Sequence, residues 1–432
     1  MRRNGCEGVP GPSSAADDFP AGAGYPERSL RSRKGAGPGE AMPDQPPRRV
    51  LLSIVIGELL ATSVWFAPNA VIGALQPYWG IDGGEGIVTT AVQLGFIIGT
   101  LSFAVFGVAD RFHASRVFLV CALISAATNL AVIVAPGWFA GVLFMRFVTG
   151  VSLAGVYPVG MKIASGWYRG GLGKALGLLV GALVLGTASP HLLEALGQDW
   201  QWQFVLVGSS LAAGAGGLLV GSVPEGPFAR SNAPVRFRGV LRAFRVPRFR
   251  AAVFGYFGHM WELFTLWAFA PVWIASYGLS GSALSLTSFA VIGMGALGCA
   301  GGGYLVESLG SGRVALGALA VSGLCCLVSP LLFTAPLWLA LAFLLIWGLA
   351  AAADSPQFSA LNAEYAPPEL IGSALTLANC VGFAISIGSL NLLEWLQHEV
   401  PAGWLFPVLA IGPAAGLWAG RALLPRPEAA PA

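Results

Sequence analysis

From Val50 onward, the chain alternates long apolar segments with short polar ones. Each apolar segment is close to the roughly 20 residues that a helix needs to cross the hydrocarbon of a bilayer, which is about 30 Å thick. The pattern therefore predicts an all-α, polytopic membrane protein with twelve transmembrane helices. The expected spans are 50–75, 86–109, 117–135, 138–163, 173–194, 201–222, 251–277, 283–306, 313–334, 336–361, 371–395 and 403–423.

The basic residues predict which ends of these helices face the cytoplasm. Lys and Arg occur in the N-terminal tail, in alternate loops and at helix ends, and only Arg146 lies within a span. Cytoplasmic loops carry the excess of Lys and Arg, so we expect both termini in the cytoplasm and the chain in the inner cell membrane. The even number of spans agrees with this topology. The loops without a basic residue are those near Asp82, Gln198, Leu279, Ala335 and Glu399.

Two segments outside the spans differ in composition from the rest. Residues 1–49 are rich in Gly, Pro and Ser and lack an apolar run, so we expect a disordered cytoplasmic tail, with Met42 as an alternative start of translation. Residues 223–250 contain seven arginines and one acid, Glu225. We interpret this basic linker as a partly helical segment at the anionic membrane surface, with a flexible linker as the alternative, and do not expect nucleic-acid binding. The expected domains are a bundle at 50–222, the linker, a bundle at 251–423 and a cytoplasmic tail at 424–432.

The overall composition excludes a soluble protein. Hydrophobic residues make up 55% of the chain, charged residues 10%, and the mean hydropathy is +0.71. Five of the six cysteines lie in apolar runs, where we interpret them as small packing residues without a disulfide or metal framework. No cofactor, nucleophile elbow or phosphate-binding loop is indicated, so an enzyme is not expected.

The two halves of the chain share three spacings. Asp110 and Glu307 each end a span and stand six residues before Arg116 and Arg313. The fourth and tenth spans share a glycine followed eight residues later by a proline, and ELLATSVWFAP at 58–68 matches ELFTLWAFAP at 262–271 with one gap. Such repeats favour a transporter whose two six-helix bundles rock around a central site. The shared glycine and proline positions are Gly150, Pro158, Gly348 and Pro356.

Over about residues 50 to 423 the sequence resembles the major facilitator superfamily. Its loop signature after the second helix is matched by Asp110 and Arg111, with Arg116 just beyond, although Phe106 and His113 replace glycines. Arg146 and Gly150 match the fourth-helix signature of the family. The fifth span lacks the Gly-Pro pair of the antiporters, and 146–162 weakly resembles the nitrate and cyanate branch. The second loop copy consists of Gly303, Glu307, Gly310 and Arg313. The resemblance implies a cavity lined by the first, fourth, seventh and tenth helices, and loop residues that gate it.

In the first half, Glu58 and Arg146 are the candidate charged site. Each lies about eight residues inside the membrane from opposite faces, roughly 12 Å deep, so their levels differ by only about 6 Å. At helical spacing, Trp65 and Asn69 fall on the same helix face as Glu58, and Tyr157 falls on the same face as Arg146. Glu58 is interpreted as the proton-binding residue, with a permanent ion pair to Arg146 as the alternative. Arg146 is equally a candidate for binding an anionic substrate.

In the second half, His259 and Glu262 are three residues apart and so lie on one helix face. A proton site is the preferred interpretation, because imidazole titrates near neutral pH. An interhelical hydrogen bond is the alternative, and a metal site lacks a further ligand. We expect Asp354 to make a cytoplasmic gate contact with Gln357 or a loop arginine, with substrate binding as the alternative. Asn379 is expected either in the cavity or in polar packing.

Together these features predict a proton-coupled secondary transporter for a small solute such as an anion or a metabolite. Drug efflux by proton antiport is the first alternative, favoured by aromatic residues and disfavoured by the missing fifth-helix signature. A non-transporting membrane receptor is the second. The expected partners are the solute, protons and the lipid bilayer, and the expected state is a monomer.

Overall fold

The computed structural model describes residues 48–81, 83–168, 172–197, 201–229, 241–367 and 370–424, which belong to one compact unit. These residues are helical and contain no strand. The tail expected at 1–47, the central part of the basic linker at 230–240 and the final tail at 425–432 lie outside the described residues.

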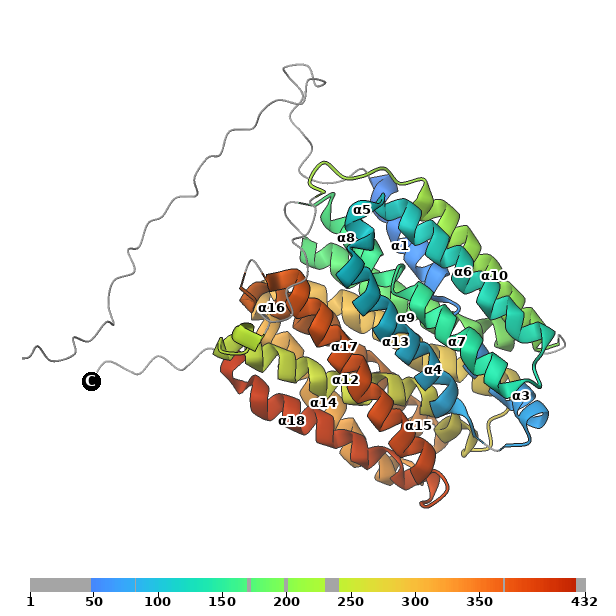
Figure 1. Cartoon of the computed structure of the whole chain (residues 1–432). Coiled ribbons are helices and arrows are strands. Elements are labelled where there is room, and N and C mark those ends of the chain that lie inside the picture. Colours follow the sequence, from blue (N-terminus) through green and yellow to red (C-terminus); the bar gives the residue numbers. More distant parts are fainter. Residues whose placement is uncertain are drawn as a thin grey trace, which may run out of the picture. The chain divides into compact units, whose positions relative to one another are not determined.

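The first half of the described chain, up to α10, forms one helical bundle (Figure 1, blue to green). Its first expected span is broken, because α1 ends at Thr62 and the helix resumes only at Ala67. The elements are α1 Arg48–Thr62, α2 Ala67–Ala70, α3 Ile72–Trp79, α4 Glu85–Phe106, α5 Val108–Arg111, α6 Ala114–Val134, α7 Phe139–Leu153, α8 Tyr157–Ser165, α9 Leu172–Leu196 and α10 Gln203–Gly221.

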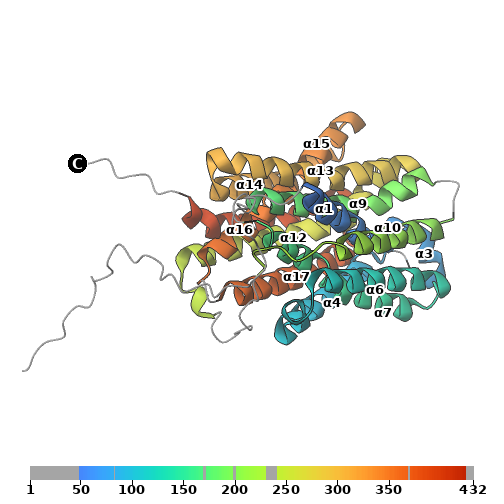
Figure 2. The same ribbon diagram turned by 90° about the horizontal axis from the view of Figure 1, so that it is seen from above.

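The second half forms another bundle (Figures 1 and 2, yellow to red). Its elements are α12 Pro247–Ala275, α13 Gly281–Leu309, α14 Ser311–Leu332, α15 Leu337–Ala353, α16 Ser355–Tyr365, α17 Ile371–Leu396, η2 Ala402–Trp404, η3 Phe406–Ala410, α18 Ile411–Gly420 and η4 Arg421–Leu423. The halves meet along two helix pairs, α9 against α13 and α4 against α17.

Ten described helical segments are long and apolar enough to cross a membrane by themselves. The two remaining expected spans are α1 to α3, which is interrupted, and α12, whose apolar run contains His259 and Glu262. With these two included, the helices form the twelve-helix, two-bundle layout that the sequence predicts.

The repeated glycines make equivalent contacts in the two halves. A Cβ atom at Gly150 in α7 would lie 1.9 Å from the carbonyl oxygen of Val92 in α4. A Cβ atom at Gly348 in α15 would lie 1.9 Å from the carbonyl oxygen of Val291 in α13. Close backbone approach of this kind is how small residues bring membrane helices together.

The fourth and tenth spans each divide into two helices. Residues 154–156 separate α7 from α8, and Asp354 separates α15 from α16. Pro158 and Pro356 lie in the first turn of the second helix of each pair, where the missing N–H of proline costs nothing. The helix break that was expected near Pro356 is therefore present, and it lies at Asp354.

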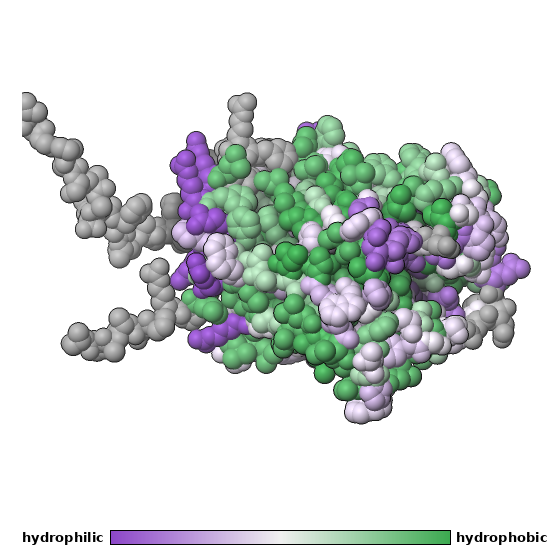
Figure 3. All heavy atoms as spheres, turned by 90° about the horizontal axis from the view of Figure 1, so that it is seen from below, coloured by the Kyte–Doolittle hydropathy of each residue, from purple (hydrophilic) through white to green (hydrophobic). Residues whose placement is uncertain are grey.

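The surface of the described residues has an apolar middle and more polar ends (Figure 3). We call the end with Arg48 and Leu424 the terminal side and the other end the distal side. Trp138, Trp338 and Trp404 are 62%, 71% and 64% exposed at the distal side, while Trp418 is exposed at the terminal side and packs under the guanidinium of Arg421. Tryptophans at both ends of an apolar band are typical of membrane interfaces.

Candidate substrate cavity and buried polar sites

A cavity of about 40 Å³ lies between the two halves. Its walls come from α8 and α9 of the first half, from α12, α15, α16 and α17 of the second half, and from the segment after α1. None of the residues that line it is charged. Its polar side chains outside the aromatic rings are Ser355, Ser359 and Asn379, and its aromatic side chains are Trp65, Tyr157, Tyr256, Phe264, Trp267 and Phe383.

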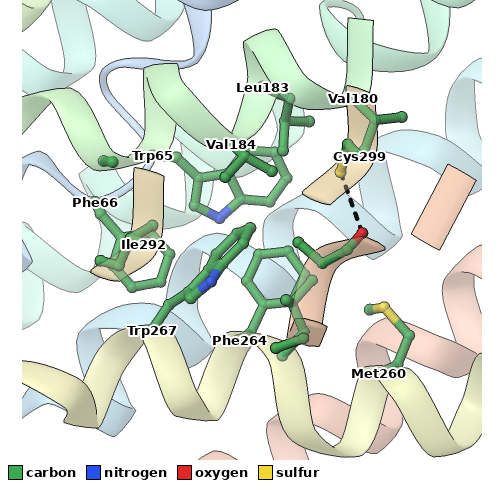
Figure 4. Close-up of a cluster of buried hydrophobic side chains, with 14 of the residues drawn as sticks. Trp65, Phe66, Val180, Leu183, Val184, Met260, Phe264, Trp267, Ile292 and Cys299 are labelled. Carbon is green, nitrogen blue, oxygen red and sulfur yellow. Dashed lines mark hydrogen bonds between the residues drawn. The ribbon is translucent and has the colours of Figure 1, made fainter. Parts of the chain in front are cut away.

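Aromatic rings from both halves pack against one another in the wall of this cavity. The ring of Trp65 stacks on Phe264 with centroids 5.7 Å apart, and Phe264 contacts Trp267 edge to face at 5.3 Å. Phe383 lies 5.0 Å from Phe264, and Phe96 of α4 lies 4.5 Å from Phe383. Figure 4 shows Trp267 and Phe264 rising from α12 toward Trp65. The rings thus join residues of both halves into one packed layer.

Hydrogen bonds between the halves close the distal side. The carboxylate of Glu394 in α17 accepts from the backbone N–H groups of Gly84 and Gly86, at 2.6 and 2.8 Å. Ser285 of α13 donates to Glu194 of α9 at 2.7 Å. Gly84 has a φ of +105°, which favours glycine, and it begins α4, whose free N–H groups and dipole attract an anion. The charge of Glu394 is therefore used to hold the two halves together.

Glu58 and Arg146 do not pair, which corrects the expectation from their depths. Both are fully buried, but Arg146 donates through Nη1 to the carbonyl oxygen of Val64 at 2.9 Å and through Nη2 to that of Trp65. The reason is the break after Thr62, because a helix end leaves carbonyl groups without intrahelical partners. The arginine supplies the missing donors. The hydropathy pattern shows an unbroken span and gave no sign of this break.

Glu58 is left without a hydrogen-bond partner for either carboxylate oxygen among the described residues. It faces Gly160 of α8, where a Cβ atom would lie 2.4 Å from Oε2 of Glu58. Asn69, expected on the same stripe, lies away from the cavity and donates to Thr89 Oγ1 at 2.9 Å and to the carbonyl oxygen of Glu85 at 3.3 Å. Of the first-half candidates, only Trp65 and Tyr157 line the cavity.

His259 and Glu262 have different partners, although both are buried on α12. Nδ1 of His259 lies 2.7 Å from Oδ1 of Asp354, at the break between α15 and α16. Glu262 accepts hydrogen bonds from Ser322 of α14 and from Nε1 of Trp347, the latter at 2.6 Å. Neither lines the cavity, whereas Asn379 does.

Asp354 therefore does not make the expected contact with Gln357 or a loop arginine. It is 1% exposed and turns inward to His259, because the break in the tenth span directs this side chain toward α12. Within the described part of the chain, no three His, Cys, Asp or Glu side chains are grouped closely enough to hold a metal ion.

The acidic residues of the two loop motifs pair with lysines. Asp110 forms an ion pair with Lys162 of α8, and Glu307 forms one with Lys174 of α9 at 2.6 Å. The second pair joins the two halves at the terminal side. The expected arginines Arg111, Arg116 and Arg313 are exposed there. The sequence did not predict roles for Lys162, Lys174 or Glu394. The position of Glu394, an acid at the end of an apolar span, could have indicated its role.

These features define a polytopic α-helical membrane protein with two bundles around a shared cavity. The sequence model of the Major Facilitator Superfamily matches residues 54–389, and the chain belongs to this family. No curated protein matches the chain.

Several solved structures share the fold. A partially occluded inward-open structure of the xylose transporter XylE from E. coli is 14% identical, covers 88% of this chain and 99% of its own, and has a TM-score of 0.67. The human organic anion transporter MFSD10 (TETRAN) is 17% identical, with coverage of 87% and 100% and a TM-score of 0.66. A mutant of the nucleoside transporter NupG is 14% identical, with coverage of 87% and 100% and a TM-score of 0.65. At these identities the likeness shows the fold alone.

Proposed function

We propose that the chain is a proton-coupled secondary transporter that moves a neutral, largely aromatic solute by alternating access. The uncharged, aromatic lining of the cavity carries this proposal. An anion in this cavity would lose its hydration without meeting a cation, because Arg146 is used to cap the end of α1. Of the two solute classes that the sequence offered, an anion or a metabolite, this proposal therefore sets aside the anion.

Coupling to protons is assigned to the buried polar groups behind the cavity wall. His259 and Asp354 form one pair, and Glu58 has no hydrogen-bond partner among the residues that the structure describes. Ionisable groups inside a membrane are costly and mark ion or proton pathways in transporters. The pair lies between α12 and the broken tenth span, which are the elements that would move when the halves rock.

The closed distal side indicates the direction in which the cavity opens. The basic residues favour the terminal side as cytoplasmic, so the proposed state is closed to the outside. Export of toxic aromatic compounds by proton antiport is the second candidate function, and the same aromatic lining favours it.

The test is proton movement in proteoliposomes that contain a trapped pH-sensitive dye. An imposed pH gradient is followed while non-ionisable aromatic solutes, sugars or nitrate are added. A neutral solute that crosses the lipid unaided carries no proton, so only carrier-mediated coupling changes the signal. We expect aromatic solutes to accelerate the decay of the gradient. Acceleration by nitrate or sugars alone contradicts the proposed solute, and binding without proton movement favours the receptor alternative.

A further inference from the structure

Two tryptophans, one in each copy of the repeated segment, both line the cavity. Trp65 follows Glu58 in the first copy of the repeat, and Trp267 follows Glu262 in the second. Each is 1% exposed. Figure 4 shows the two indole rings near one another, with Trp267 on α12. Each half thus contributes one indole to the cavity wall.

Both indole N–H groups are without a hydrogen-bond partner in the described structure. Buried polar groups are nearly always hydrogen-bonded, so an exception calls for an explanation. Other indoles of this chain do find acceptors. Trp79, Trp167 and Trp261 donate to backbone carbonyls, and Trp347 donates to Glu262.

A third buried indole without a partner provides a contrast. Nε1 of Trp273 is also unpartnered, but its ring packs among Tyr277, Phe333, Phe343 and Phe406 and does not line the cavity. Among the buried indoles of the described residues, Trp65 and Trp267 are therefore the two that combine an unpartnered N–H group with a position in the cavity wall.

We propose that the N–H groups of Trp65 and Trp267 form a two-donor site for an acceptor oxygen on the solute. The proposal rests on the proposed function, since it takes this cavity as the substrate site. The neighbouring ring of Phe264, which contacts both indoles, stacks on the flat body of the solute. The preferred ligand is a flat, neutral aromatic molecule with a carbonyl group, such as an aromatic ketone or lactone. One donor comes from each half, so the ligand links the two bundles.

The experiment compares chromone, which has a ring carbonyl, with naphthalene, which has a similar shape and no acceptor. Saturable rises in melting temperature are measured for the full chain in nanodiscs, with empty nanodiscs as the blank. We expect chromone to bind more tightly than naphthalene. Trp65→Phe and Trp267→Phe should each weaken chromone binding about fivefold, the usual worth of one neutral hydrogen bond, and leave naphthalene nearly unchanged.

Trp273→Phe is the matched control, because it removes the same unpartnered indole from outside the cavity; it should change neither affinity. Replacing Trp65 or Trp267 by benzothienylalanine, which keeps the bicyclic shape and lacks the N–H group, separates the loss of a donor from the loss of ring size. The proposal is overturned if the cavity variants lose equal affinity for chromone and naphthalene, or if their affinity for chromone is unchanged. It is also overturned if neither probe binds saturably to the protein. Selective chromone binding without coupled proton movement overturns the proposed transport and leaves the donor site standing.

Discussion

Nδ1 of His259 lies 2.7 Å from Oδ1 of Asp354, and both side chains are 1% exposed. The two residues are far apart in sequence and meet where the tenth span breaks at Asp354. The proposed proton coupling is assigned to this pair because both side chains are ionisable, buried and in contact. This pair therefore has a better claim to proton coupling than Glu262, whose carboxylate is occupied by Ser322 and Trp347.

Asp354→Asn should reduce solute-dependent proton movement at least tenfold, because an amide can still contact His259 but cannot take up a proton. Glu262→Gln should have a much smaller effect, since its amide oxygen can still accept from Trp347. Proteoliposome pH measurements compare the two variants at equal protein content. Equal losses in both, or no loss in Asp354→Asn, would remove the pair from the coupling mechanism.

Glu394→Ala should open the distal side. It removes two charge-assisted hydrogen bonds to the start of α4, each worth about 1.5 to 3 kcal/mol. We expect the equilibrium to shift at least tenfold toward the state open at that side. Pulsed electron spin resonance between labels at Tyr78 and His398, which are exposed on different halves, measures the change as a longer distance.

The matched control for this variant is Glu399→Ala, an exposed acid near the same end. Its distance distribution should equal that of the parent. Cys6 is replaced by serine for labelling, and the other five cysteines are buried. An unchanged distribution in Glu394→Ala would show that other contacts hold this side closed.

Gly150→Ala and Gly348→Ala should each destabilise the protein, by about 1 to 3 kcal/mol, because the added methyl group collides with a backbone carbonyl. Gly303→Ala is the control, since a Cβ atom there meets nothing within 4 Å. Thermal unfolding of the purified variants in one detergent compares all three. A fall in melting temperature for Gly303→Ala as large as for the others would contradict the packing argument.

The two loop ion pairs should differ in strength. Lys162 and Asp110 are only 20% and 21% exposed, whereas Lys174 and Glu307 are 48% and 66% exposed. In a double-mutant cycle, each acid is replaced by its amide and each lysine by glutamine. For the pair of Lys162 and Asp110 the cycle should give about 1.5 to 3 kcal/mol of coupling energy. The exposed pair should give a smaller coupling energy, which declines as salt is added. Unfolding free energies in mixed micelles provide the measurement, and a larger coupling for the exposed pair would reverse this ranking.

The sequence alone determined the class of the fold. Runs of about 20 apolar residues commit a chain to membrane helices, because backbone groups in hydrocarbon must bond within their own segment. The repeated Gly150 and Gly348 also indicated close helix contacts, which the structure contains. These features depend on local composition and spacing, so they can be read without knowing which helices are neighbours.

Only the tertiary structure decided the partners of the buried polar residues. Glu58 and Arg146 lie at similar depths, yet the break after Thr62 turns the guanidinium to two free carbonyls. His259 and Glu262 share a helix, yet His259 meets Asp354 at the break between α15 and α16, whereas Glu262 bonds to Ser322 of α14 and Trp347 of α15. Depth follows from counting residues, but the rotation of each helix and the position of a break follow from packing between distant segments. For that reason the sequence identified the right kinds of residues and not their pairs.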